Sequence, residues 1–322
     1  MKVMVTGGAG YIGKLIIDDL CANPSVDNVV IIDRKPKPED LDNPKIVYYA
    51  LDLAQNLWEE FVREIPDYVI HCAFDIRSPY KEINKQEFIN LESSKRIFEY
   101  CFKHKVKKMV YLSSAASYGA RERNIGRLLK EEDALQEKDF PYGYQKRRVE
   151  EILNEKIVQN KNSLMQIFVL RLATVNGVEG EKRKAPSLMS YIKNKLPFMP
   201  YANDNSARQY INEVDVINAV KTLLFSDIKS QYEVFNLAPD DFLTFKQMAE
   251  LLGKKAIKIP EIFVKVGFFL AWHLTMGYIP TPQGAWKSYI YPSNLDGSKI
   301  KKFGFNYQYT CKQTFLVDKK EV

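Results

Sequence analysis

Hydrophobic residues recur with two different periods along the first half of the chain. Short apolar runs of the kind that forms buried strands alternate with segments in which apolar residues repeat at helical period. The predicted strands span residues 1–5, 29–33, 46–50, 68–72, 108–113 and 164–172. The predicted helices span residues 11–20, 57–64, 85–103 and 142–160. This order predicts an α/β fold of the Rossmann type, a doubly wound parallel sheet with helices on both faces.

Beyond residue 176 the alternation loosens, and eight prolines divide the chain into shorter pieces. We therefore expect residues 1–175 to form the Rossmann domain and residues 176–322 a smaller, mixed region that binds the substrate. Part of 207–240 is expected to return to the Rossmann domain.

Residues 262–279 are dense in apolar side chains. Lys265, His273 and two glycines interrupt the segment, and it is short for a bilayer-spanning helix. The pattern favours a buried helix of the substrate-binding region over a spanning or membrane-surface helix, and contact with a membrane stays open at this point.

A glycine-rich turn follows the first predicted strand directly and opens the first predicted helix. Gly7, Gly10 and Gly13 have the spacing that lets a backbone approach a dinucleotide pyrophosphate. The N–H groups and positive dipole end of the helix attract such an anion. The turn therefore predicts a dinucleotide site, although a purely structural glycine turn has the same pattern.

The second predicted strand ends in Asp33, about 20 residues after the last glycine, where a Rossmann fold binds the adenosine ribose. A carboxylate there repels a 2′-phosphate and favours NAD over NADP, while Arg34 next to it offsets part of that repulsion. Asp52 and Leu53, after the third strand, suit the adenine amino group and ring.

Composition changes this picture little. The formal net charge of +7 suits phosphate-bearing ligands and is too diffuse to indicate nucleic acid. The four cysteines have no metal-site spacing, so we expect free thiols and no metal centre. The chain starts with a strand and shows no signal-peptide pattern, which makes the cytoplasm the expected location.

Two residues with complementary chemistry lie four apart at the start of the helix predicted for 142–160. Tyr142 and Lys146 share one helix face, and an ammonium beside a phenol lowers the pKa of the phenol. Tyr142 is thus a candidate for proton exchange with a substrate hydroxyl. Ser114, after the strand predicted for 108–113, lies at the edge where open α/β sheets bind ligands and is the candidate for a substrate hydrogen bond.

Taken together, these motifs resemble the extended short-chain dehydrogenase/reductase family, which comprises NAD-dependent sugar epimerases and dehydratases. The likeness covers nearly the whole chain. It rests on Thr6 to Gly13, Asp33, Asp52-Leu53, His71-Cys72-Ala73, Asn90, Ser113-Ser114, Tyr142-x-x-x-Lys146, Leu170-Arg171 and residues 207–216, 235–238 and 303–310.

The resemblance implies that Ser114, Tyr142 and Lys146 are the catalytic triad, that Asn90 supports the lysine, and that Arg208 contacts a substrate diphosphate. It also implies a homodimer formed through the helices predicted for 85–103 and 142–160. The implied cofactor-binding residues are Gly7, Gly10, Tyr11, Ile12, Gly13, Asp33, Arg34, Asp52, Leu53, Cys72, Ala73, Asn90, Tyr142 and Lys146.

The chain departs from the family pattern at two places that bear on the substrate. Ala115 and Ala116 stand where the dehydratases carry an acidic pair, which argues against dehydration. Thr174 stands where the sugar epimerases usually have a phosphate-binding asparagine, and it takes that place among the candidate substrate-binding residues.

Three functions remain open at this point. The first is an epimerase that acts on a nucleotide-diphosphate sugar through a transient keto intermediate. The second is an NAD(P)-dependent dehydrogenase or reductase of a hydrophobic alcohol or ketone, similar to hydroxysteroid or flavonol reductases, with residues 262–279 lining the pocket. The third is an NAD-sensing regulator without catalytic activity.

Overall fold

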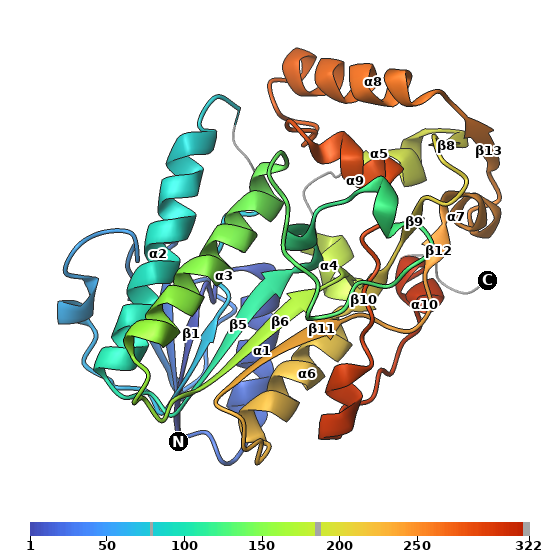
Figure 1. Ribbon diagram of the computed structural model, residues 1–322. Coiled ribbons are helices and arrows are strands. Elements are labelled where there is room, and N and C mark those ends of the chain that lie inside the picture. The colour runs from blue at the N-terminus through green and yellow to red at the C-terminus, as the bar shows by residue number, and fades with distance from the viewer. Residues whose placement is uncertain (78–79, 184–187, 318–322) are drawn as a thin grey trace.

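A computed structural model describes residues 1–77, 80–183 and 188–317 of the chain. Its centre is a seven-stranded sheet in which all neighbouring strands run parallel, in the order β11-β6-β5-β4-β1-β2-β3 (Figure 1). The strands are β1 (Lys2–Thr6), β2 (Asn28–Asp33), β3 (Ile46–Ala50), β4 (Tyr68–His71), β5 (Lys108–Ser114), β6 (Gln166–Leu172) and β11 (Tyr232–Leu237). The predicted doubly wound Rossmann sheet is confirmed.

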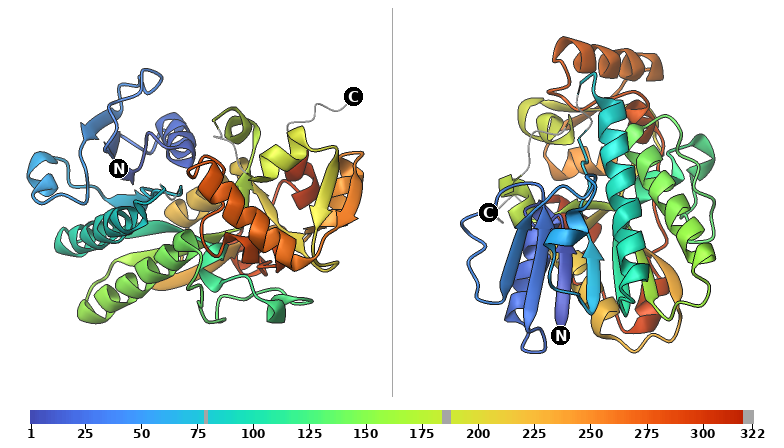
Figure 2. Two further views of the ribbon diagram at one scale, coloured as in Figure 1. Left: turned by 90° about the horizontal axis from the view of Figure 1, so that it is seen from above. Right: turned by 90° about the vertical axis from the view of Figure 1, so that its left-hand side faces the viewer.

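Two pairs of helices cover the two faces of this sheet. On one face lie α1 (Tyr11–Ala22) and α6 (Glu213–Phe225), and on the other lie α2 (Ile83–Lys103) and α3 (Pro141–Gln159), side by side in Figure 2. Alternate strand residues separate into the two cores, so Val3 and Val5 pack toward α1 while Met4 packs toward α2 and α3. Strand alternation thus buries both faces of the sheet.

A smaller lobe of short elements is built from the second half of the chain. Its core, distinct from the two beside the sheet, contains Met199, Phe245, Met248 and Tyr289. The strands are β7 (Thr174–Asn176), β8 (Phe198–Tyr201), β9 (Ala207–Arg208), β10 (Tyr210–Asn212), β12 (Leu243–Thr244) and β13 (Lys255–Lys258), which form two-stranded pairs. The helices are α4 (Val178–Arg183), α5 (Leu188–Lys195), α7 (Phe245–Leu251), α8 (Glu261–Leu274), α9 (Ala285–Ile290) and α10 (Cys311–Phe315).

The helix expected for 57–64 is wrong. The chain forms only a 3₁₀ helix there, η1 (Trp58–Phe61), after Leu57 in the left-handed conformation with φ 66°. Trp58 packs on Tyr100 with ring centroids 5.1 Å apart. A short amphipathic segment forms only a marginally stable helix by itself, so the packing of Trp58 against α2 determines the local backbone conformation.

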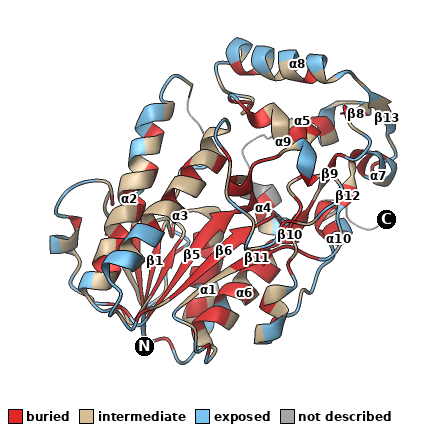
Figure 3. Cartoon of the chain, viewed as in Figure 1, coloured by how far each residue is buried: buried red, intermediate tan, exposed pale blue. Residues whose placement is uncertain are grey.

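The burial expected for residues 262–279 is also wrong. The segment forms α8, which ends at Leu274, and of its side chains only Val264 and Trp272 are buried. Figure 3 shows most of α8 as exposed. One side of the helix packs on α9, where Phe268 meets Tyr289, and the other side has no covering element among the described residues. Within those residues, no helix has both the length and the hydropathy needed to cross a bilayer.

Candidate active site

The carboxyl ends of β1, β4 and β5 meet at one edge of the sheet. The glycine turn follows β1, residues 72–77 follow β4, and Ser114 ends β5. Parallel strands place such segments together at the edge where open α/β sheets bind ligands. The candidate site is built on this edge.

The glycine turn brings two backbone segments too close for side chains. Gly7 has φ 73°, and a Cβ on it would lie 2.7 Å from the backbone of Ala73. A Cβ on Gly13 would lie 2.3 Å from the carbonyl oxygen of Gly7. Gly10 caps α1 without a side-chain hydrogen bond, so the N–H groups of the first helical turn remain available to an anion.

A cavity of about 150 Å³ lies beside this turn, and its walls contain nine of the predicted cofactor-binding residues. The Asp33 carboxylate accepts hydrogen bonds from the backbone N–H groups of Ala9 (3.0 Å) and Lys35 (2.9 Å), which fixes it at the rim. Leu53 is buried in the wall. The nine are Gly7, Gly10, Asp33, Arg34, Asp52, Leu53, Cys72, Ala73 and Asn90.

Tyr11, although it is the first residue of α1, directs its hydroxyl elsewhere. The hydroxyl hydrogen-bonds the Glu213 carboxylate, which also accepts from the backbone N–H of Gly180 at 3.0 Å. The Tyr11 side chain therefore connects α1 with α4 and α6. Neither Tyr11 nor Ile12 is among the residues that line the cavity beside Asp33.

The three candidate catalytic residues converge from two elements. Tyr142 and Lys146 lie on the first two turns of α3, which Pro141 starts, and Ser114 ends β5. The Ser114 side chain lies close enough to Tyr142 to lower the pKa of its phenol. Lys146 Nζ donates to the Leu112 carbonyl oxygen at 2.6 Å, so the ammonium lies against the strand that carries Ser114.

The pKa values of Tyr142 and Lys146 differ from the expectation that the lysine lowers the pKa of the tyrosine. Burial raises the pKa of Tyr142, and the Ser114 side chain offsets part of the rise; Lys146 is not among the groups that shift it. Burial also lowers the pKa of Lys146 to about 7, against smaller opposing effects of Cys72 and Glu150. Because desolvation outweighs the attraction between an ammonium and a phenolate here, the protein alone holds Tyr142 as a neutral phenol.

Phe74, which the sequence analysis did not single out, covers the lysine. Its ring centroid lies 3.8 Å from Lys146 Nζ, and its ring meets that of Tyr142 edge-on at 5.8 Å. The only feature of the sequence that could have indicated a role for Phe74 is its position directly after His71-Cys72-Ala73. The ring lies between the cavity beside Asp33 and the catalytic pair.

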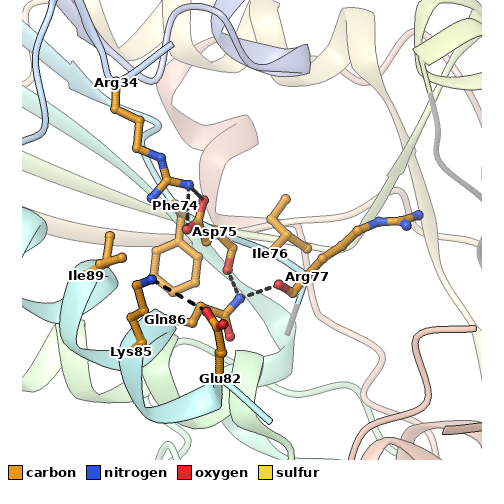
Figure 4. A pocket seen from close by; sticks show the side chains of 9 residues that line it. All are labelled: Arg34, Phe74, Asp75, Ile76, Arg77, Glu82, Lys85, Gln86 and Ile89. Atoms are coloured by element: carbon orange, nitrogen blue, oxygen red, sulfur yellow. Dashed lines mark hydrogen bonds and ion pairs between the residues drawn. The ribbon is translucent and has the colours of Figure 1, made fainter. Parts of the chain in front are cut away.

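A second, open hollow of about 500 Å³ adjoins the first, and the two share Arg34, Phe74, Asp75 and Ile89 as lining residues (Figure 4). Both Asp75 carboxylate oxygens accept from the Arg34 guanidinium at 2.8 Å. This ion pair joins the end of β2 to the segment after β4.

Asn90 anchors the segment after β4. Its Oδ1 accepts from the backbone N–H of Asp75 at 2.7 Å, and its Nδ2 donates to the Asp75 carbonyl oxygen at 3.1 Å and to Gln145 Oε1 at 2.8 Å. Asn90 therefore reaches Lys146 only through the neighbouring residue, Gln145.

A buried ion pair lies farther along α3, one turn beyond Lys146. The Glu150 carboxylate accepts from Arg171 Nη2 at 2.8 Å and from the Ser113 hydroxyl at 2.5 Å. Arg171 also donates to the Tyr118 hydroxyl at 2.6 Å. The sequence signal was the spacing of Tyr142, Lys146 and Glu150, which places all three on one face of a helix.

The two remaining predicted substrate residues lie in the smaller lobe. Thr174 is exposed at the start of β7, and Arg208 lies on β9 with its guanidinium over the Phe245 ring. The buried Arg208 Nε has no hydrogen-bond partner among the described residues. Those residues contain no cluster of three or more potential metal-ligating side chains.

Comparison with known proteins places these features in context. Residues 3–238 match the family model described as the NAD dependent epimerase/dehydratase family. The dTDP-4-dehydro-6-deoxyglucose reductase of Escherichia coli is 26% identical over 79% of this chain and 83% of its own length. The UDP-glucose 4-epimerase of Schizosaccharomyces pombe is 28% identical over 61% and 58%.

Among solved structures, the UDP-glucose 4-epimerase of Thermotoga maritima, crystallised with UDP-glucose, superposes with a TM-score of 0.74. It is 20% identical, and the match covers 98% of this chain and 97% of that one. At this identity the likeness establishes the fold.

Proposed function

The chain belongs to the NAD dependent epimerase/dehydratase family, and from this premise we propose that it epimerises a nucleotide-diphosphate sugar through a transient keto-sugar. The observation that carries the proposal is the convergence of Ser114, Tyr142 and Lys146 beside the cavity that Asp33 lines. This set combines a proton-transfer group, a hydrogen-bonding hydroxyl and a cation.

The residues of the cavity fit NAD. Gly7 packs its backbone against Ala73 with no room for a side chain, which keeps the turn close to the cavity, and the Asp33 carboxylate is fixed at the rim where a ribose would lie. We propose that Gly7, Gly10 and the first turn of α1 hold the pyrophosphate, and that Asp33 accepts from the ribose hydroxyls. When bound, NAD supplies an acceptor, and later a donor, of hydride.

Tyr142 is the proton-transfer group in this proposal. The phenolate takes the proton from the sugar hydroxyl as its carbon loses hydride, and the phenol returns the proton once the keto-sugar has turned its other face. Ser114 donates to the same substrate oxygen and holds it beside Tyr142. Burial raises the pKa of Tyr142, so the phenolate needs a positive charge that the protein alone does not supply. The positive ring of NAD would supply that charge when it is bound.

Arg208 is the proposed anchor for the diphosphate. Its buried Nε has no partner among the described residues, and a phosphate oxygen would satisfy it. Tight binding of the diphosphate is needed because a keto-sugar that dissociates before it is reduced again would be released as an oxidised product.

Thr174 supports a second candidate, a dehydrogenase or reductase. An exposed hydroxyl at this position gives a weaker phosphate contact than the asparagine of the sugar epimerases. The apolar segment once expected to line a pocket for a hydrophobic alcohol instead faces outward on α8, so it no longer favours that substrate class.

The test is to incubate the protein with NAD and each of a panel of nucleotide sugars, and to follow the products by proton NMR. An epimer without net reduced cofactor is expected, and Tyr142→Phe should abolish it. Reduced cofactor in proportion to product would establish the dehydrogenase instead. Thermal stabilisation by NAD without product from any sugar or alcohol would establish a cofactor-sensing regulator.

The homodimer stays a prediction. We propose that it forms through α2 and α3, which expose Phe88 and Val158 on their outer surfaces. Light scattering on the wild type and on Phe88→Glu tests it, since a charge in the interface should shift the mass toward that of one chain. The cytoplasmic location is likewise a prediction.

A further inference from the structure

The outward surface of α8 is almost entirely apolar. We define the α8 face as Ile262, Phe263, Val266, Phe269, Leu270 and Leu274, all of which are exposed. Phe263 and Phe269 are 63% and 62% exposed, and an exposed apolar surface that several neighbouring side chains share is typical of an interaction site. The one titratable side chain on this surface is His273.

The opposite side of the helix already has its partners. Trp272 and Val264 are buried, Phe268 packs on Tyr289, and Lys265 lies 4.5 Å over the Trp286 ring. One apolar side of α8 therefore packs on the lobe, and the α8 face is a second apolar side that does not. Met276 and Tyr278, just beyond the helix, extend it with exposed fractions of 73% and 68%.

The part of the chain that carries this face has an excess of positive charge. Residues 252–287 contain five lysines and one glutamate, a net of +4 out of +7 for the whole chain. Asp204 and Asp139 pair with Lys258 and Lys287. Lys255 and Lys265 have no ion-pair partner within the described residues.

Tyr80, which precedes α2, lies against the far end of α8. The Tyr80 hydroxyl hydrogen-bonds His273 Nδ1 at 3.0 Å, and the Tyr80 ring meets Trp272 at 5.6 Å. Exposed Lys81 lies over the Tyr80 ring, so its charge is held beside the α8 face. One cation is therefore held beside the end of the apolar surface that carries His273.

We propose that the α8 face docks on the surface of a membrane that contains anionic phospholipid. A helix with an apolar outer face and flanking lysines lies in the interface plane, where the apolar side chains enter the acyl boundary and the lysines meet the headgroups. A symmetric contact with a second copy would bring the same cations together, whereas an anionic bilayer neutralises them. This role is independent of the proposed reaction.

Vesicle sedimentation tests the proposal on the full chain. We expect the wild type to sediment with phosphatidylcholine vesicles that contain phosphatidylglycerol, and far less with phosphatidylcholine alone. Because two large apolar side chains no longer enter the acyl boundary, the double variant Phe263→Glu/Phe269→Glu should bind at least about tenfold more weakly. The matched control is Phe61→Glu, an equally exposed aromatic on η1 at the other side of the molecule (Figure 1).

Several outcomes would overturn the proposal. They are a wild type that stays in the supernatant, equal binding to vesicles of both compositions, or equal loss of binding in Phe61→Glu. A further outcome is that the wild type is a dimer and does not bind vesicles, while the double variant is a monomer. That result would make the α8 face a contact between two copies of the chain. Thermal unfolding of each variant confirms that the proteins compared are folded.

Discussion

The ring of Phe74 lies over the ammonium of Lys146, with 3.8 Å between the ring centroid and Nζ. The same ring touches Tyr142, so one side chain from the segment after β4 covers both members of the Tyr-x-x-x-Lys pair. The family resemblance implies that Lys146 contacts the cofactor, and such a contact would require this ring to move when the cofactor binds.

Phe74→Ala should therefore bind NAD more tightly than the wild type, by about fivefold, because a cation–π contact of about 1 kcal/mol no longer has to be broken. Isothermal titration calorimetry measures the difference. Phe74→Leu is the control, since it keeps apolar bulk over the lysine without the ring. Unchanged or weaker binding in Phe74→Ala would show that the ring contributes to the cofactor site.

Tyr142→Phe and Ser114→Ala should separate chemistry from binding. Each removes one hydroxyl of the proposed proton-transfer site, and loss of a proton-transfer group costs about 10²–10⁴-fold in kcat. NAD affinity should change little in Ser114→Ala, because the serine is assigned to the substrate. Turnover by Tyr142→Phe at the wild-type rate would remove Tyr142 from the mechanism.

Lys146 should make the protein more stable as the pH rises. Its folded-state pKa of about 7 lies below the ordinary 10.5, so the unfolded chain binds the proton more tightly. The charged lysine thus costs stability below pH 7, and the cost disappears between pH 7 and 10.5. We expect a few kcal/mol over that window.

Because tyrosines and cysteines titrate in the same range, the measured quantity is the difference between wild type and Lys146→Met. Urea unfolding across this range should show Lys146→Met as the more stable protein near neutral pH, with the gap closing as the pH rises. A gap that stays constant would mean that Lys146 is not desolvated.

The predicted site residues that the structure brings together are those whose place follows from strand and helix order. The glycine turn, Asp33 and Ser114 all follow strand ends, and Tyr142 and Lys146 share a helix face, so pattern and spacing were sufficient. Phe74 was missed because its contact depends on the path of a loop, which has no periodicity.

The α8 error has a different physical origin. Its apolar residues surround the helix, and such a pattern predicts burial on all sides. Which side is covered depends on what the rest of the fold supplies, and the lobe supplies α9 on one side only. The pKa values of Tyr142 and Lys146 were likewise not predictable from their spacing, because they depend on how deeply the fold buries both groups.

The buried pair of Glu150 and Arg171 should be important for stability. Removing one partner leaves an uncompensated charge, so Arg171→Met and Glu150→Gln should each cost about 3–5 kcal/mol in the free energy of unfolding. Arg171→Met/Glu150→Gln should recover part of that loss, because neither charge remains. Chemical denaturation of the four proteins gives the coupling energy, and additive losses would contradict the pairing.

Arg34 and Asp75 should set the discrimination between NAD and NADP together with Asp33. Asp33 repels a 2′-phosphate, and Asp75 occupies the neighbouring guanidinium with two contacts at 2.8 Å. The ion pair is partly exposed and contributes at most about 1 kcal/mol, so a phosphate competes for Arg34 once Asp75 is neutral. Asp75→Asn should therefore tighten NADP binding by about fivefold and leave NAD binding nearly unchanged.

Asp33→Ala/Asp75→Asn should shift the preference further, since it removes the repulsion and frees the cation at once. Arg34→Ala in the Asp75→Asn background is the control, and it should cancel the gain for NADP. Titration calorimetry with both cofactors measures each step. If Asp75→Asn changes the affinity for NAD and NADP equally, the ion pair acts on the shape of the segment after β4, and Arg34 does not reach the 2′ position.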